Sequence, residues 1–328
     1  MIFVPGRAEV EKLENLEEIC KKMFQFEEVE KDCFRPTSLF HARQTPSGIA
    51  FGGLIFSQAL AVAEITVDEK YKPNSMHSYF VLAINSTLPL FYHVKRVRDG
   101  KSFANRTVEA IQNNKLCFMC QVSFHKPEPD SMTHKTIQMP KISGPEGFKP
   151  MREAVIQMQD LVNQGKIHLA PAMHHRLMVL DNKAYLLQNE PFEFRCCNLG
   201  NYYGFSSDLK PEMCFWIRAK GELSEDERFH RWLLALISDS TLIPSTMSPH
   251  FALGFQDSLH VSLDHSLWFH QSCSVRADEW LLLECRSRIS SGARCLMEGR
   301  VWRRDGTLVA SCQQEAIIRG KDGQVSKI

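Results

Sequence analysis

Residues 229–244 are the most apolar helix-like stretch of the chain, and we expect the other elements to pack around it. Its large aliphatic residues, which fall on more than one side of a helical wheel, are Leu233, Leu234, Leu236, Ile237, Leu242 and Ile243. A helix that is apolar nearly all round belongs in a protein interior, and Pro244 is expected to end this one. The stretch is shorter than the ~20 residues that a membrane-spanning helix needs.

Asp239 is the exception within this stretch, because it places a carboxylate where burial is expected. A buried carboxylate must be hydrogen-bonded, paired with a charge or used in chemistry. The alternative is an Asp that caps a neighbouring turn through its own side chain.

The N-terminal half has a helix of the same kind, followed by strands. Ala50-Phe51-Gly52-Gly53 leads into an apolar run at 54–63. Stretches rich in β-branched and aromatic residues, separated by turn signals, follow at 77–80, 88–97, 103–111 and 116–124. They predict an antiparallel meander, preceded by a charged helix over 8–31 and a short strand at 33–35.

The order helix-then-strands returns after a linker. Residues 126–150 are rich in Pro, Ser, Gly and Lys, and 151–164 predict a short amphipathic helix. A strand at 213–221 then precedes the Asp239 helix, and strands are expected at 259–269, 279–288, 293–303 and 307–319. The predicted divisions are an N-terminal helical segment (1–34), a first repeat (35–125), a linker with a short helix (126–190), a second repeat (191–320) and a tail (321–328).

Sequence matches between the two halves support a repeat. His77-Ser-Tyr-Phe matches His265-Ser-Leu-Trp-Phe, and Phe56-Ser57-Gln58 matches Ile237-Ser238-Asp239. Two copies joined by a linker predict a pseudo-symmetric pair. Each copy is expected to be an α+β unit, in which an antiparallel sheet of about four to six strands curls around one buried helix.

Composition excludes several classes of partner. The formal net charge is +1, so nothing in the bulk charge indicates a nucleic acid or an anionic membrane surface.

The cysteines number 11, an odd count in a chain that shows no secretory signal, and they indicate free thiols in a reducing compartment. The lone pair Cys117 and Cys120 lies in a strand-like run that places the two thiols on opposite faces. Ser326-Lys327-Ile328 approaches the peroxisomal address Ser-Lys-Leu.

Common catalytic motifs are missing from the sequence. We find no G-x-S-x-G nucleophile elbow, phosphate-binding loop, G-x-G-x-x-G or H-E-x-x-H. His174-His175 has no matching set of further ligands. We therefore expect neither a nucleophilic serine nor a metal site.

Polar residues in apolar surroundings of the second half suggest a different chemistry. If the strands alternate, Ser262 and Gln314 face the helix that carries Asp239. The carboxylate would then accept a proton from a water molecule, which the hydroxyl and the carboxamide orient for attack on a carbonyl. Taken alone, a strand Ser is usually a tolerated small residue and a strand Gln is usually exposed.

The repeat predicts that one site combines both halves. Gln58 stands where the second half has Asp239, so the first half lacks a general base. Gly52 and Gly53 open the first helix, where backbone N–H groups and the helix dipole can meet an oxyanion; the second half has Asp226-Glu227-Arg228 there. We expect Gly52 and Gly53 to lie beside Asp239, Ser262 and Gln314.

The motifs together resemble a known family. In the first half they are Phe51-Gly-Gly-x-x-x-Ser-Gln-Ala-Leu, His77-Ser-Tyr-Phe, Arg98-Asp-Gly-Lys-Ser-Phe and Ala110-Ile-Gln-Asn. In the second half they are Phe215-Trp-Ile-Arg-Ala, Ile237-Ser-Asp, Leu263-Asp-His-Ser-Leu-Trp-Phe-His, Asp278-Glu-Trp-Leu-Leu-Leu-Glu and Gln314-Glu-Ala. Over 35–125 and 210–320 the chain resembles type II acyl-CoA thioesterases, and within them the peroxisomal branch. Leu54 departs from the Gln that the family usually has after Phe-Gly-Gly.

The resemblance implies a double hotdog fold and hydrolysis of acyl-CoA to free acid and CoA. It implies an Asp, Ser/Thr and Gln triad that falls on Asp239, Ser262 and Gln314. We assign Gly52, Gly53, Gln58 and His77 to the oxyanion and substrate-binding groups, although His77 and His265 also suit structural hydrogen bonding. No cofactor is expected beyond the CoA of the substrate.

Partners and location complete the expectations. A homodimer or higher homo-oligomer is expected because single hotdog units have exposed sheet edges. Ser326-Lys327-Ile328 is expected to address the peroxisomal import receptor, with the cytoplasm as the alternative location. A non-catalytic acyl-CoA-binding or regulatory subunit remains the alternative function. A hotdog hydratase is disfavoured because the Asn-Pro-Ile-His segment that it needs is absent.

Overall fold

The computed structural model describes residues 16–39, 48–180, 191–270 and 275–328. The strands of the first half are β1 (Phe26–Glu30), β2 (Cys33–Pro36), β3 (Lys72–Phe80), β4 (Phe91–Asp99), β5 (Phe103–Gln112) and β6 (Lys115–His125). Those of the second half are β7 (Phe192–Cys196), β8 (Glu212–Ala219), β9 (Asp257–Ser262), β10 (Asp264–Phe269), β11 (Leu281–Ser291), β12 (Arg294–Arg303) and β13 (Leu308–Gly320). The helices are α2 (Leu16–Lys22), α3 (Gly52–Ile65), α4 (Met151–Asn163), α5 (Pro171–His175), α7 (Leu199–Tyr203), α8 (Glu227–Ser238) and α9 (Leu242–Ala252). None of these helices is long and apolar enough to cross a membrane.

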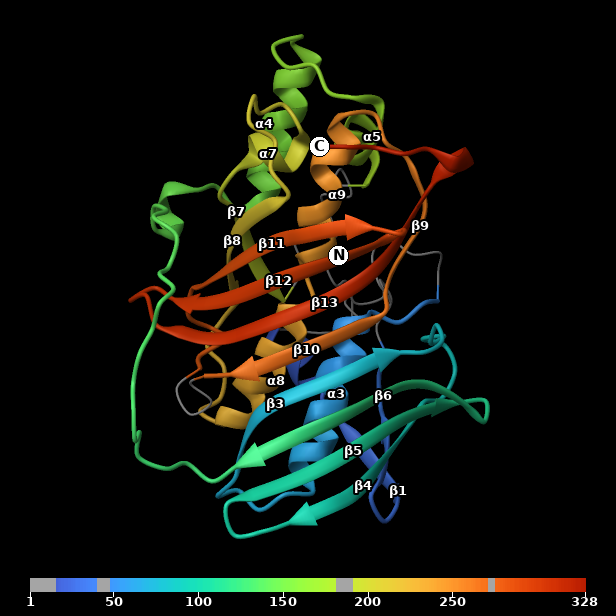
Figure 1. Cartoon of the computed structure of the whole chain (residues 1–328), viewed down its shortest axis with the longest axis vertical. Coiled ribbons are helices and arrows are strands. Elements are labelled where there is room, and N and C mark those ends of the chain that lie inside the picture. The colour runs from blue at the N-terminus through green and yellow to red at the C-terminus, as the bar shows by residue number, and fades with distance from the viewer. Residues whose placement is uncertain (1–15, 40–47, 181–190, 271–274) are drawn as a thin grey trace.

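The strands form one antiparallel sheet that runs through both halves. Its order is β1-β2-β4-β5-β6-β3-β10-β13-β12-β11-β8-β7, with β9 paired to β13. The halves join where β3 pairs with β10, in a register that sets Ser78 opposite His265. Figure 1 shows the first half below, the second half above, and α3 and α8 behind the strands of this junction. The predicted repeat of a sheet and a central helix is therefore confirmed.

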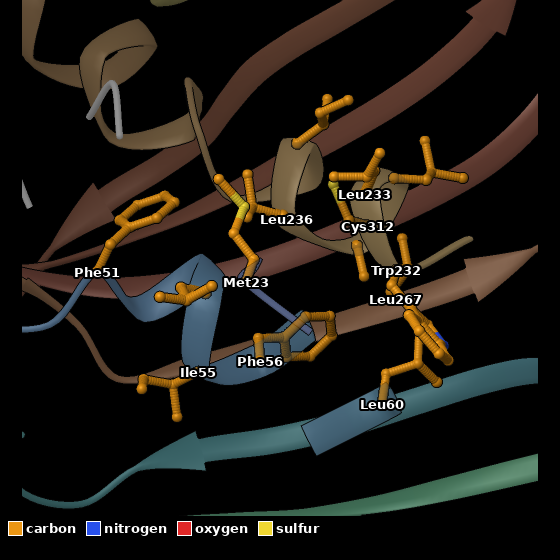
Figure 2. Close-up of a cluster of buried hydrophobic side chains, with 14 of the residues drawn as sticks. Met23, Phe51, Ile55, Phe56, Leu60, Trp232, Leu233, Leu236, Leu267 and Cys312 are labelled. Atoms are coloured by element: carbon orange, nitrogen blue, oxygen red, sulfur yellow. The ribbon is translucent and has the colours of Figure 1, made fainter. Parts of the chain in front are cut away.

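Helices α3 and α8 form the centre of the core. Residues Gly53 to Glu64 of α3 and Phe229 to Ser238 of α8 are all buried, as their apolar residues on several sides require. Figure 2 shows Phe51, Ile55, Phe56 and Leu60 from the first half beside Trp232, Leu233 and Leu236 of α8, with Leu267 and Cys312 coming from strands of the sheet. The sheet and both helices thus share one continuous hydrophobic core.

A buried ion pair joins the two helices across the halves. The Arg231 guanidinium donates to Glu64 Oε1 from Nη2 (2.7 Å) and from Nε (3.1 Å), and the Trp232 indole N–H donates to Glu64 Oε2 (2.8 Å). Arg231 Nη1 also donates to Glu227, at 3.2 Å from its Oε2. The side chains of Arg231 and Glu64 are only 0% and 4% exposed, so each charge depends on the other. The pair ties the C-terminal end of α3 to the N-terminal turns of α8, and the two helices therefore run antiparallel.

The end of the central helix differs from the prediction. α8 ends at Ser238, and Asp239 is its C-cap. Pro244 does not end this helix; it lies in the first turn of the next helix, α9, where its missing N–H leaves no helical hydrogen bond unmade. The strand expected over 259–269 is also divided at Leu263, because the pairing with β13 shifts by one residue between Ser262, opposite Ala316, and Ser266, opposite Gln313. Ser262 consequently ends a strand of its own.

The N-terminal segment is not wholly helical. Residues 8–15 of the expected helix lie outside the described residues, and 26–30 form strand β1. A turn at Asp32 (φ 60°) reverses the chain into β2, and Arg96 Nη2 holds this turn by donating to Asp32 Oδ1 (2.8 Å). Residues 26–36 thus extend the sheet of the first half.

The linker packs along the second half through hydrogen bonds and apolar contacts. Trp216 Nε1 donates to Ser143 O (3.0 Å), and Arg304 Nη1 donates to Glu146 Oε1 (2.7 Å). Its apolar residues cover a separate small cluster of buried side chains; the members are Trp216, Leu282 and Trp302, with Ile137, Met139 and Phe148 against them. Figure 1 shows this green segment passing beside the sheet before α4, the helix predicted at 151–164.

The buried pair predicts a large stability effect for Glu64→Gln. The amide keeps the shape of the side chain but leaves the buried Arg231 charge without its closest partner, so we expect the free energy of unfolding to fall by about 3 kcal/mol. The measurement is urea unfolding followed by fluorescence and by circular dichroism. The matched control is Glu69→Gln, because Glu69 is 81% exposed in its contact with Arg228 and should change stability by less than about 0.5 kcal/mol. Equal midpoints for Glu64→Gln and the wild type would contradict the role given to this pair.

Candidate active site

Asp239, Ser262 and Gln314 meet at the end of α8. Gln314 Nε2 donates to Asp239 Oδ1 (2.6 Å) and to Ser262 Oγ (2.6 Å). An amide NH₂ has two hydrogens, so both bonds can form at once. The Asp239 side chain is nearly buried at 8% exposure, and Gln314 is fully buried. The structure therefore brings Asp239 of the apolar helix together with the two residues that strand alternation had selected, Ser262 and Gln314.

Strand alternation explains how the two strand residues reach the helix. On β13 the side chains of Cys312, Gln314 and Ala316 are buried, whereas that of Gln313 is exposed. Ser262 pairs with Ala316 at the end of β9, next to Gln314 on the same sheet. The period of two predicted from the sequence is thus the one observed.

The start of α3 approaches Asp239 from the other half. A Cβ on Gly53 would lie 2.7 Å from Phe51 Cε1 and 3.0 Å from Asp239 Cβ, and one on Gly52 would lie 3.4 Å from Asp239 Oδ2. Contacts this short leave no room for a side chain at position 53. The structure therefore places the Gly52–Gly53 turn beside Asp239, where the repeat predicted it.

Backbone N–H groups at this helix start point to a second feature of the site. Phe51, the N-cap, makes no side-chain cap bond, and the Leu54 and Ile55 N–H groups donate to Phe51 O. Gly52 and Gly53 carry the N–H groups that precede these bonds. The Gly53 N–H bonds to the Asp239 carboxylate, so it holds the carboxylate instead of serving only as an oxyanion donor.

Burial sets the protonation of Asp239. Removal from water raises the pKa of Asp239 to about 6, against the opposing hydrogen bonds from Gln314 and from the Gly53 backbone. The carboxylate lies at the negative end of α8, but the positive end of α3 faces it. A base with a pKa near 6 is ionised at neutral pH and still accepts protons effectively.

His77 does not belong to this site, contrary to the assignment from sequence. Its side chain is exposed, while those of its neighbours Met76 and Ser78 are buried. His77 Nδ1 lies 3.1 Å from Ser266 Oγ, and its ring packs edge-on to Trp268. The repeat alignment that matched His77 to His265 is therefore offset, because these two side chains point to opposite faces of the sheet.

Gln58, also assigned from the sequence to the substrate-binding groups, has its amide bonded within the protein. Its Oε1 accepts from the Tyr92 hydroxyl (2.9 Å), and its Nε2 donates to Met23 O (2.6 Å). Gln58 is fully buried and its amide groups are taken by these protein contacts. The position in the first half that corresponds to Asp239 is thus bonded to Met23, directly after α2, and to Tyr92 of β4.

Arg106 and the histidine pair His174-His175 have structural or surface positions. Arg106 is buried, with Nε donating to Thr66 Oγ1 (2.9 Å) and Nη2 to Asp99 Oδ1 (2.7 Å), so its guanidinium is bonded within the protein. His174 and His175 are exposed on α5. In the described part of the chain, no group of three or more His, Cys, Asp or Glu is arranged to hold a metal ion.

Two contacts around Asp239 have no clear sequence signal. His265 is buried with Nε2 2.9 Å from the hydroxyl of Ser238, the residue before Asp239. The Phe80 ring packs over the α3 start, 3.1 Å from where a Gly52 Cβ would lie. A structural hydrogen bond of His265 was expected, but its partner is distant in sequence and could not be named.

Comparisons with known proteins agree with this geometry. A family model described as acyl-CoA thioesterase matches residues 198–317, and one described as acyl-CoA thioesterase N-terminal domain matches 40–125. Acyl-coenzyme A thioesterase 8 of Homo sapiens is 36% identical over 309 residues, which cover 93% of this chain and 90% of the relative. Peroxisomal acyl-coenzyme A thioester hydrolase 1 of Saccharomyces cerevisiae is 23% identical, over 82% of this chain and 85% of the relative.

Solved structures show the same architecture. Acyl-CoA thioesterase II TesB2 from Mycobacterium marinum superposes with a TM-score of 0.69 at 26% identity, covering 94% of this chain and 99% of that one. A hot dog fold protein from Alicyclobacillus acidocaldarius gives a TM-score of 0.67 at 14% identity, covering 92% and 98%, and supports the fold alone. The chain therefore belongs to the acyl-CoA thioesterase family and has the double hotdog fold of its type II members.

Proposed function

We propose that this chain hydrolyses fatty acyl-CoA thioesters to free fatty acid and CoA, with Asp239 as the general base that activates water. The observation that carries the proposal is the contact of Asp239 with Gln314 on one side and with the start of α3 on the other. One carboxylate is thereby placed between groups that orient a water molecule and groups that stabilise negative charge.

The water-orienting groups are Gln314 and Ser262. Both N–H bonds of Gln314 are used on Asp239 and Ser262, which leaves its Oε1 as an acceptor. This Oε1 is buried and has no hydrogen-bond partner among the described residues. A water bound by Gln314 Oε1 and the Ser262 hydroxyl would transfer a proton to Asp239 as its oxygen attacks the thioester carbonyl carbon.

The start of α3 stabilises the charge that this attack creates. As the carbon–oxygen bond forms, negative charge develops on the carbonyl oxygen, and the Gly52 N–H and the positive end of the helix dipole can receive it. Collapse of the intermediate breaks the carbon–sulfur bond. Thiols ionise near pH 8.5, so CoA can leave as a thiolate and recover a proton from Asp239 or from solvent.

Only one such site is expected in each chain. The first half has the amide of Gln58 at the corresponding position, and that amide is occupied by Tyr92 and Met23. The second half has the carboxylate, and it takes the glycine helix start from the first half. Each half thus supplies what the other lacks.

Location and assembly form a finer part of the proposal. The yeast relative is named peroxisomal, and Ser326-Lys327-Ile328 resembles the peroxisomal address, so we propose import through the peroxisomal receptor. Ser326 Oγ lies 2.9 Å from His250 Nδ1, a contact that receptor binding would have to break. Imaging of the chain with and without residues 326–328 tests this import.

We also propose a homo-oligomer, because β1 ends the sheet with a largely exposed strand, and light scattering measures its mass.

Asp239→Asn should lower kcat by roughly a hundredfold or more, because the amide cannot accept the proton of the attacking water. The measurement is release of the CoA thiol from a panel of acyl-CoA substrates. The matched control is Asp264→Asn, since the Asp264 carboxylate accepts from the Glu315 N–H (2.6 Å), a bond that an amide oxygen can also make. Wild-type binding of acyl-CoA without hydrolysis, or an Asp239→Asn variant as fast as wild type, would favour the binding-subunit alternative.

The raised pKa of Asp239 predicts an acidic limb in the rate profile. The base must be ionised, so kcat/KM should decrease tenfold per pH unit as the pH falls below the Asp239 pKa of about 6. Measurement of kcat/KM between pH 4.5 and 8.5, with protein stability followed in parallel, locates the limb. The residual activity of Asp239→Asn should lack it. A limb near pH 4 in the wild type, or the same limb in the Asn variant, would be inconsistent with Asp239 as the base.

A further inference from the structure

His265 is buried at the junction of the two halves. It lies on β10, is 0% exposed, and its carbonyl accepts from Ser78 Oγ (2.8 Å) on β3 of the first half. Its ring packs edge-on to Phe56 of α3, with 4.6 Å between ring centres and planes at 86°. The imidazole is therefore held in one place by both halves.

The polar contact of this imidazole is with the residue before Asp239. His265 Nε2 lies 2.9 Å from Ser238 Oγ, while Ser238 Oγ donates to Ala235 O at 2.8 Å. A hydroxyl has a single hydrogen, and Ser238 uses it on Ala235 O, so His265 Nε2 is the donor. Burial lowers the pKa of His265 to about 3, so the imidazole is neutral. Its Nδ1 is buried without a hydrogen-bond partner in the described parts of the chain. Of the two imidazole nitrogens, Nδ1 thus stays unpaired among the described residues, while Nε2 donates to Ser238.

The corresponding serine of the first half shows what this contact adds. Ser57 Oγ donates to Leu54 O (2.9 Å), the same bond three residues back that Ser238 makes. No histidine bonds to Ser57 among the described contacts, and α3 continues from there to Ile65. α8 instead ends at Ser238, whose carbonyl also accepts from Cys312 Sγ (3.7 Å). α8, which ends beside the Asp239 carboxylate, is thus held at its last residue by His265 and Cys312, whereas α3 has no such contact at Ser57 among the described residues.

We propose that His265 is a positioning residue for Asp239. By donating to Ser238 it fixes the last turn of α8, and thereby the direction from which the Asp239 carboxylate meets Gln314 and the start of α3. The inference rests on the proposed function, in which Asp239 is the general base. His265 itself touches neither the water nor the thioester in this account.

The test removes either end of the contact and then restores it. Ser238→Ala and His265→Leu should each lower kcat by roughly tenfold to a hundredfold with KM changed less than about twofold, because small displacements of a catalytic group act on the chemical step. His265→Gln places an amide donor near the Nε2 position and should recover most of the loss. The double variant should be no slower than the slower single variant, because both changes remove one contact.

Ser57→Ala is the matched control, since it removes the same helical bond in the first half and should keep the wild-type kcat. Wild-type kcat in Ser238→Ala, or a double variant that loses the product of both single losses, overturns the proposal. Ser238→Ala decides the matter if His265→Leu does not fold. Asp239→Asn is measured in parallel: if it is as fast as wild type, the general base itself is rejected, whereas a slow Asp239→Asn beside a fast Ser238→Ala rejects only the positioning role.

Discussion

The antiparallel packing of α3 against α8 is the constraint on which the site depends. At one end the two helices are joined by Glu64 and Arg231, a buried ion pair whose partners come from different halves of the chain. At the other end Gly53 packs against Asp239. Glu64 lies twelve residues after Gly52 on α3, roughly 18 Å along the axis. An ion pair far from Asp239 therefore sets the register in which the proposed base meets the start of α3.

The dipoles of the two antiparallel helices act in opposite senses on the Asp239 carboxylate. A carboxylate at the C-terminal end of α8 faces the negative end of that helix, which is unfavourable by itself. The start of α3 brings its positive end and the Gly53 N–H to the same carboxylate. Burial and these bonds act in opposite senses on the Asp239 pKa, and the result near 6 suits a base at neutral pH. The ionised state of Asp239, and with it the proposed reactivity, thus depends on contact between the halves.

Local patterns in the sequence were enough to find the residues that face the core. Asp239 was recognised because it interrupts an apolar helix, and Gln314 because strand alternation turns it toward that helix. The sequence match of His77 to His265 does not hold in the structure, where His77 is exposed and His265 is buried; in a strand, a shift of one residue reverses the face of a side chain. The sequence pattern does not reveal this offset, whereas the pairing of β3 with β10 does.

Contacts between distant residues were the part that the sequence could not predict. Gln58 looked available until Met23 and Tyr92 were seen to use its amide. The contacts of the linker were not predicted because their partners lie far along the chain, as with the Ser143 carbonyl that accepts from the Trp216 indole and the Glu146 carboxylate that accepts from Arg304. The Glu64–Arg231 pair likewise spans 167 residues. In each case the partner is chosen by the tertiary fold and leaves no mark in the neighbouring sequence.

The most direct test of a site shared by both halves is a crystal structure with a bound 2-oxoalkyl-CoA, in which a methylene between sulfur and carbonyl prevents hydrolysis. If the site is shared, the ketone oxygen should lie within about 3 Å of the Gly52 N–H. The ketone carbon should lie on the side of Asp239, with room for one water held by Gln314 and Ser262. A ketone bound beside Gln58, or away from the start of α3, would contradict a single site assembled from the two halves.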